Sequence, residues 1–364
     1  MTGTFKNFFF FLIRSIVFWV IACCFFIIIR QYAINELENI REDSPFYIPV
    51  TQWLHFGVLV GLAIGVIYAT GEWTFEKYIT PKLNLGISIV IKTISYLLVL
   101  IIILSILTFR IEKYLDVDLS NDRGWWRTSK IFWLTVVYFW VCSMVFALMK
   151  IASERFGRGM FFNILIGKYR KPQEVNKLFM FLDLKSSTSI AEAIGHFKYS
   201  QMIQDCFYDL NSLIDKYDAD IYQYVGDEAV LTWDYNSGTK KNRCISLFFA
   251  FKKRLKQRSE YYLKTYGHQP EFKAGLHGGK LMVAEIGAVK KDLAFHGDVI
   301  NTASRIQSLC STYDKELLIS EPVLSKLSIS ETHYELLSED VELRGKDERL
   351  KIYAIDNRTV KNKV

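Results

Sequence analysis

The chain has 364 residues, enough for more than one domain, and 51% of them are hydrophobic although 23% are charged. Its net charge of +7 does not require a nucleic-acid partner, because many basic residues flank apolar segments, where anionic lipid headgroups are natural partners. The six cysteines form no C-x-x-C pair, which argues against a zinc site or a patterned disulfide framework.

The first 150 residues contain four long apolar runs. Each is near the ~20 residues that a helix needs to cross a bilayer. The predicted spans are Phe8–Ile29, Gln52–Thr70, Leu85–Phe109 and Ile131–Met149. The first run is too long for a removable signal peptide and lacks a small-residue cleavage site. We therefore predict an all-α transmembrane bundle of four helices over residues 1–150, with the lipid bilayer as its partner.

The distribution of basic residues bears on orientation. Four spans put both termini on one side of the membrane, and six basic residues closely follow the last span, which favours a cytoplasmic C-terminal part. These are Lys150, Arg155, Arg158, Lys168, Arg170 and Lys171. The loop over 110–130, on the opposite side, carries five basic residues offset by four acids, which weakens the asymmetry. The predicted location is the cell inner (plasma) membrane.

Several polar and small residues lie within the predicted spans. Arg14 and Lys92 are costly there unless they are paired or snorkel, and both lie about two turns from a span end, so we expect snorkelling. Gly57, Gly61 and Gly65 form a doubled G-x-x-x-G, which allows another helix to approach closely. That helix belongs either to the same chain or to a second copy.

Residues 151–176 form a basic connector between the apolar half and the rest. Gly157, Gly159 and Pro172 interrupt any continuous helix there. A different pattern begins at Lys177, with expected elements in this order: strand "LFMFLDL", helix 187–217, hairpin "YQYVGDEAVLTW", helix 240–265, strands 271–278 and 281–286, a helix from about 299, strand 316–320 and a hairpin over "VELRG…LKIYAI". This order predicts an α+β sandwich with helices on one face of a sheet.

Two carboxylates are candidates for a metal site. Asp183 ends the first strand, and Asp227 lies at the hairpin tip. If the first strand lies beside the hairpin, both reach one end of the sheet, where carboxylates and substrate phosphates typically hold Mg²⁺. Two such ions ~3.5–4 Å apart activate a hydroxyl and stabilise a leaving phosphate. The turn "LKSST", with Ser187 and Thr188, offers N–H groups to phosphate at a helix start. Asp227 taken alone is more typical of an ordinary turn residue than of a metal ligand.

A second polar cluster is "FHGDVINTASRIQ", residues 295–307. Asn301 and Arg305 are four apart, on one face of a helix that starts near Gly297. An amide and a cation so aligned can stabilise a phosphorus centre that is gaining charge. The alternative is an exposed helix with a solvated arginine.

Four motifs occur together in order: "F-x-D-x-x-x-S-T", "Y-x-G-D", "G-L-H-G-G-x…G-x-I-G" and "G-D-x-x-N-x-x-x-R". This series resembles the signature of the class III adenylate/guanylate cyclase catalytic domain. The resemblance implies a ferredoxin-like cyclase sandwich, a βαββαβ core with extra strands, over 177–357, followed by a polar tail at 358–364. It covers about half the chain and leaves the membrane half without a comparable signature.

The resemblance also implies roles for individual residues. Asp183 and Asp227 match the metal-binding aspartates, with the carbonyl of Leu184 as a further ligand, for two Mg²⁺ (or Mn²⁺) ions per site. Asn301 and Arg305 match the pair that stabilises the transition state, contributed by the other subunit of a homodimer. Ser187 and Thr188 lie at the phosphate turn, and Arg344 or Lys346 resembles a late basic residue that meets the triphosphate. The implied reaction is attack of the 3′-hydroxyl on the α-phosphate, which releases pyrophosphate.

The residues expected to read the base depart from the family pattern. Adenylate cyclases commonly have Lys where this chain has Gln223, and Asp or Thr where it has Ala294; guanylate cyclases use Glu and Cys. An alanine reads no base edge, and glutamine both donates and accepts. ATP is the preferred substrate by family frequency, which would make the protein an adenylate cyclase in cyclic-nucleotide signalling. GTP is the alternative.

Two other interpretations remain open. The hairpin "VGDE" resembles the G-G-D-E-F loop of diguanylate cyclases, but Val225 replaces the first glycine and those enzymes lack the later "GDxxNxxxR". A catalytically silent nucleotide-binding domain is the second, although all four polar motif residues are retained. Glu228, next to Asp227, is expected to point the other way along the strand and either to be structural or to support the metal ligands without touching the metal.

Overall fold

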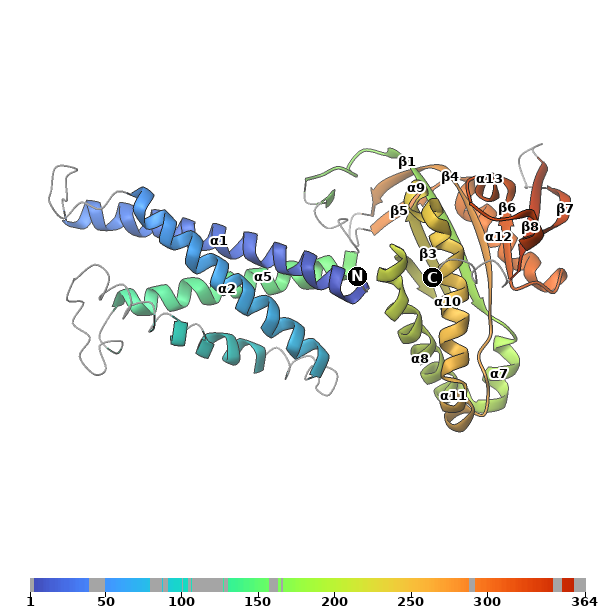
Figure 1. Ribbon diagram of the computed structural model, residues 1–364, viewed down its shortest axis with the longest axis horizontal. Coiled ribbons are helices and arrows are strands. Elements are labelled where there is room, and N and C mark those ends of the chain that lie inside the picture. Colours follow the sequence, from blue (N-terminus) through green and yellow to red (C-terminus); the bar gives the residue numbers. More distant parts are fainter. Residues whose placement is uncertain are drawn as a thin grey trace. The chain divides into compact units, whose positions relative to one another are not determined.

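The computed structural model describes residues 3–38, 50–78, 87, 91–99, 101–103, 106, 127, 130–156, 163–164, 166–287, 292–342 and 349–356. The chain divides into two compact units, residues 1–154 and 155–364, drawn in blue to green and in green to red in Figure 1.

The N-terminal unit is helical. Its long helices are α1 (Gly3–Glu38), α2 (Val50–Tyr78) and α5 (Lys130–Phe156). Three segments, Phe8–Tyr32, Trp53–Glu76 and Phe132–Ser153, are long and apolar enough to cross a membrane. They confirm three of the four predicted spans. The remaining one, Leu85–Phe109, falls largely outside the described residues, although 91–99 and 101–103 are helical.

The glycine stripe of α2 packs against α1 of the same chain. A Cβ on Gly61 would lie 2.5 Å from Cα of Val20, and one on Gly65 would lie 2.6 Å from Cα of Ile16. Only glycine permits this approach of two helix backbones. Ser15 of α1 uses the same contact to donate a 2.8 Å hydrogen bond to the carbonyl of Gly65. Of the two alternatives for the stripe, packing within the chain is therefore the one observed.

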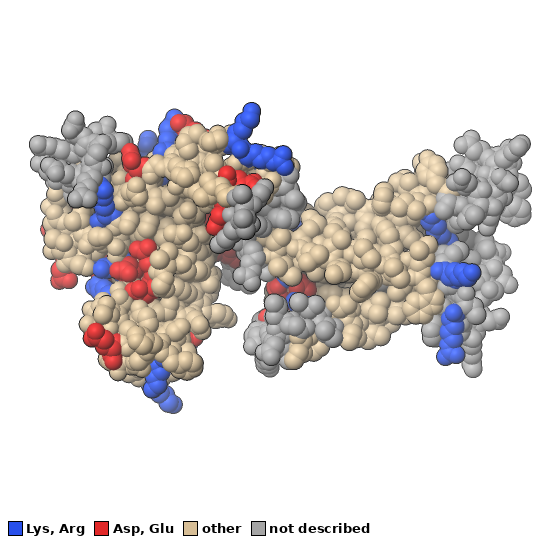
Figure 2. Space-filling view, turned by 180° about the vertical axis from the view of Figure 1, so that it is seen from behind, with Lys and Arg blue, Asp and Glu red and all other residues tan. Residues whose placement is uncertain are grey.

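Charged groups in the helical unit meet at Glu72, a buried residue of α2. Its Oε1 lies 2.7 Å from the ammonium groups of Lys92 and Lys150, and the hydroxyl of Tyr96 donates to its Oε2. Lys150 also contacts Glu76. The expectation that Lys92 snorkels was wrong, because a carboxylate on the neighbouring helix satisfies its charge inside the bundle. On the face shown in Figure 2, Lys and Arg side chains gather at one end of this unit, and its middle presents a broad uncharged surface that suits contact with lipid.

The C-terminal unit alternates strands and helices. Its strands are β1 (Gln173–Leu184), β2 (Asp220–Val225), β3 (Glu228–Asp234), β4 (Phe272–Ile286), β5 (Asp292–His296), β6 (Leu317–Ser320), β7 (Tyr334–Glu342) and β8 (Arg349–Ile355). Its α-helices are α7 (Ser187–Ile194), α8 (His196–Ile214), α9 (Tyr235–Thr239), α10 (Arg243–Gln257), α11 (Ser259–Tyr266), α12 (Asp298–Thr312) and α13 (Glu321–Leu324).

The strands of the described residues form one sheet in the order β2-β3-β1-β4-β6-β8-β7, with β5 paired to β4. All pairs are antiparallel except β4 with β6. The first four strands in the order β2-β3-β1-β4, joined by helices after β1 and β3, are the predicted ferredoxin-like core. Two predicted strands, 271–278 and 281–286, are one continuous strand, β4, and β5 was not anticipated.

Helices cover both faces of this sheet, whereas the sequence predicted one. Met180 and Leu182 of β1 are in the core shared with α8 and α10. Phe181, which points the opposite way, packs with Val299 and Ala303 of α12. Figure 1 shows α12 separated from α8 and α10 by the strands. Helix α12, which carries Asn301 and Arg305, therefore lies on the opposite face of the sheet from α8 and α10.

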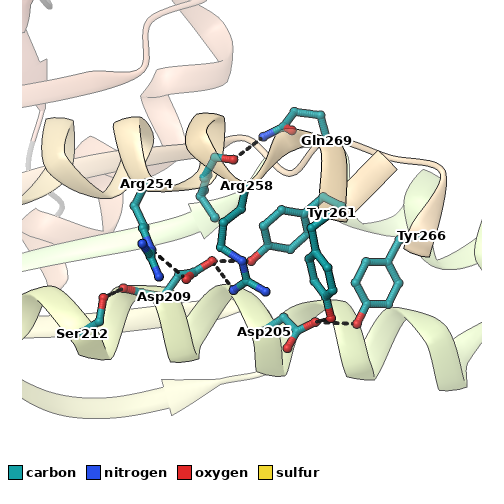
Figure 3. Close-up of polar contacts among 10 residues, drawn as sticks. Asp205, Asp209, Ser212, Arg254, Arg258, Tyr261, Tyr266 and Gln269 are labelled. Atoms are coloured by element: carbon teal, nitrogen blue, oxygen red, sulfur yellow. Dashed lines mark hydrogen bonds and ion pairs between the residues drawn. The ribbon is translucent and has the colours of Figure 1, made fainter. Parts of the chain in front are cut away.

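A polar network holds α10 and α11 against α8 (Figure 3). Asp209 of α8 is fully buried, and its carboxylate accepts from Arg254 at 3.1 Å, Arg258 at 2.7 Å and the hydroxyl of Tyr262 at 2.8 Å. One turn earlier, Asp205 accepts from Tyr261 and Tyr266. Charge-assisted bonds of this kind fix geometry, so the helical layer is a rigid support for the sheet.

Candidate active site

The two aspartates predicted to bind metal lie at the same end of the sheet. Asp183 is the penultimate residue of β1, and Asp227 follows Gly226 in the two-residue turn between β2 and β3. Gly226 has a φ of 61°, which glycine adopts without strain in such a turn. Because β1 and β3 pair as far as Asp183 with Glu228, the turn lies beside the end of β1.

Asp227 carries an unsatisfied group. Its Oδ2 is buried and makes no hydrogen bond to any residue that the structure describes. A buried carboxylate oxygen without a donor is unfavourable unless a cation supplies the missing interaction. This orphan oxygen distinguishes Asp227 from an ordinary solvated turn residue.

Glu228 lies on the side of the sheet occupied by Asp183, not away from the site as expected. The two residues are direct partners across β1 and β3. Burial, and then the negative charges of Asp183 and Asp227, raise the pKa of Glu228. The expectation applied strand alternation to Asp227 and Glu228, but only Glu228 belongs to β3, and its pairing with Asp183 decides which side it faces.

Asp183 is held by two donors from its own chain. Lys273 of β4 is its partner on the other side of β1, and their Nζ–Oδ2 distance is 3.2 Å. Gln307 of α12 donates from Nε2 to the same oxygen at 2.9 Å. No hydrogen bond from a described residue reaches Oδ1.

The donor set fits a hard divalent cation. Among the described residues, no group of three or more His, Cys, Asp and Glu side chains forms a closed metal site. Mg²⁺ is usually bound by one or two carboxylates together with substrate phosphates, so two aspartates suffice. Leu184 ends β1 with its side chain buried, which leaves its backbone carbonyl as the group it can offer.

The predicted phosphate turn begins a helix directly after β1. Ser187 and Thr188 are the first two residues of α7, which no side chain caps at its N-terminus. Ser186 before them has a left-handed φ of 55° that turns the chain. Tyr199 of α8 interacts with the side chain of Ser187, and burial, followed by the charge of Asp227, raises the pKa of Tyr199. The turn and Asp227 are thus joined through one tyrosine.

Asn301 and Arg305 lie in the first half of α12. Asn301 is exposed, Arg305 is half-buried, and neither makes a hydrogen bond or ion pair with a described residue. Their spacing puts them on one side of the helix. No hydrogen bond or ion pair within the described chain joins them to Asp183 or Asp227.

The two base-reading positions are on neighbouring segments. Gln223 is exposed on β2, after a bulge at Tyr222, and Ala294 is in β5 opposite Ala284. The residues beside them are in contact, since the ring centroids of Tyr222 and Phe295 lie 5.0 Å apart. The other two predicted residues, Arg344 and Lys346, lie outside the described residues.

Sequence reasoning missed three residues of this site: Tyr199, Lys273 and Gln307. Lys273 directly precedes the "AGLHGG" motif, and Gln307 comes two residues after Arg305, so both adjoined segments already singled out. Tyr199 had no such signal, because only the packing of α8 beside the turn brings it to Ser187.

Comparison with known proteins identifies the type of domain. Residues 171–357, slightly more than half the chain, match the family model described as adenylate and guanylate cyclase catalytic domain. The chain is 36% identical over 174 residues to adenylate cyclase 2 of Rhizobium meliloti (strain 1021), with 48% of each sequence covered. It is 28% identical over 179 residues to an adenylate cyclase of Anabaena cylindrica, covering 48% of this chain and 36% of that one. The chain thus spans about half, or less, of the length of these relatives.

The fold has counterparts among solved structures. Two structures of a bacterial light-regulated adenylyl cyclase superpose with TM-scores of 0.52 and 0.53 at 16% identity. The matches cover 64% and 66% of this chain and 67% and 68% of the others. At this identity the likeness concerns the fold alone.

Proposed function

Because the chain belongs to the adenylate and guanylate cyclase catalytic domain family, we propose that it converts ATP to 3′,5′-cyclic AMP and pyrophosphate. The observation that carries this proposal is the buried, unpartnered Oδ2 of Asp227 at the sheet end that also holds Asp183. Both carboxylates lie where a metal–triphosphate complex needs them, next to a helix start with phosphate-binding potential.

The active unit is a homodimer with two composite sites. Asn301 and Arg305 have no hydrogen-bonding or ionic partner in the described part of their own chain, which supports a role on a second copy. In each site, one subunit supplies Asp183 and Asp227, and the partner supplies Asn301 and Arg305.

The chain's own groups bind and orient the nucleotide. Asp183, Asp227 and the carbonyl of Leu184 would hold two Mg²⁺ or Mn²⁺ ions. When bound, these ions activate a hydroxyl and neutralise phosphate charge. Ser187 and Thr188, with Arg344 or Lys346, would donate hydrogen bonds to the triphosphate. Asn301 and Arg305 stabilise the charge that develops on the α-phosphate. The 3′-oxygen gives up its proton to solvent and bonds to the α-phosphorus, while the bond from that phosphorus to the oxygen bridging the α- and β-phosphates breaks and pyrophosphate leaves with the electron pair.

The helical unit anchors the enzyme in the cell inner membrane, with the catalytic domain in the cytoplasm. We divide the chain into a transmembrane domain (1–150), a connector (151–176), the catalytic domain (177–357) and a polar tail (358–364). The two compact units support a boundary near 154. The three apolar helices, and basic residues after the last, support the orientation.

ATP is the proposed nucleotide because the curated relatives that match are named adenylate cyclases. Gln223 and Ala294 match neither usual base-reading pair, so GTP is the second candidate. A glutamine amide offers both a donor and an acceptor, which suits the edge of either purine.

A complementation experiment tests the shared-site enzyme. Full-length Asp183→Ala and Asn301→Ala chains are each expected to be inactive in detergent with Mn²⁺ and ATP. The two variants are then co-expressed, or mixed so that folded subunits exchange. Each heterodimer contains one intact site, so part of the wild-type production of cyclic nucleotide should return. If each variant is inactive and the mixture stays inactive despite forming heterodimers, the composite site is wrong.

A further inference from the structure

Gln307 connects helix α12 to the proposed metal site of its own chain. Its side chain is 5% exposed, and its Nε2 donates a 2.9 Å hydrogen bond to Oδ2 of Asp183. Lys273 lies 3.2 Å from the same oxygen. Both interactions therefore hold one oxygen of the carboxylate, and the other, Oδ1, receives no hydrogen bond from a described residue.

The backbone of the sheet places Gln307 there. Gly275 of β4 lies directly under α12, and a Cβ on it would fall 2.2 Å from the backbone nitrogen of Gln307 and 2.7 Å from the carbonyl oxygen of Ala303. Gly275 is also the cross-strand partner of Phe181, two residues before Asp183. Because Gly275 has no side chain, α12 can approach the sheet closely enough for the Gln307 amide to reach Asp183 on β1.

A second contact ties the same part of α12 to the site. Lys273, besides its pairing with Asp183, donates a 2.9 Å hydrogen bond to Oγ of Ser311, one turn after Gln307. The Asp183 carboxylate, the lysine ammonium and two side chains of α12 thus form one connected set. A group held on one oxygen by two donors has a fixed orientation.

We propose that Gln307 is a positioning residue for the metal: it fixes the Asp183 carboxylate so that Oδ1 is presented to a divalent cation. The inference rests on the proposed function, because it requires that Asp183 binds the ion. Partners that orient a metal ligand typically contribute 10–100-fold to metal affinity. Gln307 does not touch substrate in this account and acts through Asp183.

The position of Gln307 has a consequence for the dimer. Asn301 and Arg305 lie on the same helix, six and two residues earlier, and serve the other composite site. Helix α12 therefore links the metal carboxylate of one site to the phosphate-stabilising side chains of the other.

Direct metal binding tests the inference without turnover. Full-length wild-type, Gln307→Met and Ser308→Ala proteins in detergent are titrated with Mn²⁺ in the presence of 3′-deoxy-ATP, which lacks the attacking hydroxyl, and free Mn²⁺ is measured by its electron paramagnetic resonance signal. Methionine keeps the length of glutamine but lacks the amide donor. Ser308 is the exposed neighbour on α12 and serves as the matched control.

We expect about 10-fold or greater weakening of Mn²⁺ binding in Gln307→Met and no change in Ser308→Ala. Equal affinity in wild type and Gln307→Met would overturn the inference alone. A wild-type protein that binds no Mn²⁺ and cyclises neither nucleotide would overturn the proposed function, and the inference with it.

A heterodimer distinguishes positioning of the Asp183 carboxylate by Gln307 from a general disturbance of α12. This experiment also works if the Gln307→Met homodimer folds poorly. One subunit carries Asn301→Ala and the other Asp227→Ala, so the single intact site uses Asp183 of the first and Asn301 of the second. Gln307→Met in the first subunit should raise the Mn²⁺ concentration for half-maximal turnover about 10-fold. In the second subunit it should leave that concentration unchanged. Equal effects in both placements would overturn the positioning role.

Discussion

Asp183 and Glu228 face each other across β1 and β3, so two acidic side chains adjoin at the end of the sheet. Burial and the charges of Asp183 and Asp227 raise the pKa of Glu228. A raised pKa means that the folded state holds this proton more tightly than the unfolded state. The ionised glutamate therefore destabilises the metal-free fold once the pH exceeds the ordinary carboxyl range of about 4.

The substitution Glu228→Gln removes this repulsion. At pH 7 and without metal, we expect the variant to be more stable than wild type by about 0.2–1 kcal/mol, the range for like charges opposite each other in a sheet. The gain should shrink as the pH falls toward about 4, where both states are protonated. Thermal unfolding in chelator at several pH values measures this; a gain that grows toward low pH would contradict the assignment.

Asp227→Asn should lower the cyclase activity and raise the stability of the metal-free protein. The amide keeps the shape of the side chain but removes a buried charge whose Oδ2 has no partner among the described residues. We expect the metal-free protein to gain about 0.2–1 kcal/mol, because the amide removes the repulsion between this charge and the neighbouring acidic groups Asp183 and Glu228. Asp234→Asn, at the exposed far end of β3, is the control and should give no gain. Loss of stability in Asp227→Asn would mean that the carboxylate is satisfied in the folded chain.

Glu72→Gln should destabilise the helical unit. The substitution leaves Lys92 and Lys150 without the carboxylate that they share inside the bundle. Breaking a buried ion pair by removal of one partner costs about 3–5 kcal/mol. Glu76→Gln is the matched control, because Glu76 lies one turn later on α2 and is half-exposed, so its loss should cost far less. Thermal unfolding of both full-length variants in the same detergent measures the two losses of stability. Equal losses would show that the burial of Glu72 does not determine its contribution to stability.

Substitutions at Gln223 and Ala294 should change the choice of base. Their neighbours Tyr222 and Phe295 are in ring contact, which brings β2 and β5 together at this point. Gln223→Lys with Ala294→Asp, the pair typical of adenylate cyclases, should raise the ratio of kcat/KM for ATP over GTP. Gln223→Glu with Ala294→Cys should lower it. A correctly placed hydrogen bond to a base edge is worth about 1–3 kcal/mol, or roughly 5- to 150-fold. If the kcat/KM ratio for ATP over GTP is unchanged in both double variants, residues other than Gln223 and Ala294 recognise the base.

The order of elements and the paired aspartates were accessible from sequence because they depend on local patterns. A short apolar run identified β1, and β-branched and aromatic residues on both sides of Gly226 identified the β2–β3 hairpin with Asp227 at its tip. The predicted helix over 187–217 was nearly right, but Gly195, with a φ of 78°, divides it into α7 and α8. Apolar runs likewise identified three membrane helices by length and composition.

What sequence did not reveal depends on packing between distant segments. Gly278 and Gly279 suggested a turn, yet both lie inside β4; a Cβ on Gly278 would fall 2.3 Å from Cδ2 of Leu178, so the glycine permits close packing. In the same way, Gln307 reaches Asp183 only because Gly275 lets α12 pack closely against β4. The pairing of Lys92 with Glu72 required knowledge of which helices are neighbours.

Cyclase activity is best measured as turnover by the purified full-length protein with Mn²⁺ or Mg²⁺, given ATP or GTP in separate reactions and assayed for 3′,5′-cyclic product and pyrophosphate. We predict cyclic AMP from ATP as the main product, and at least about 100-fold less from Asp227→Asn under the same conditions. Nucleotide binding with no cyclic product from either substrate, or undiminished product from Asp227→Asn, would contradict this prediction.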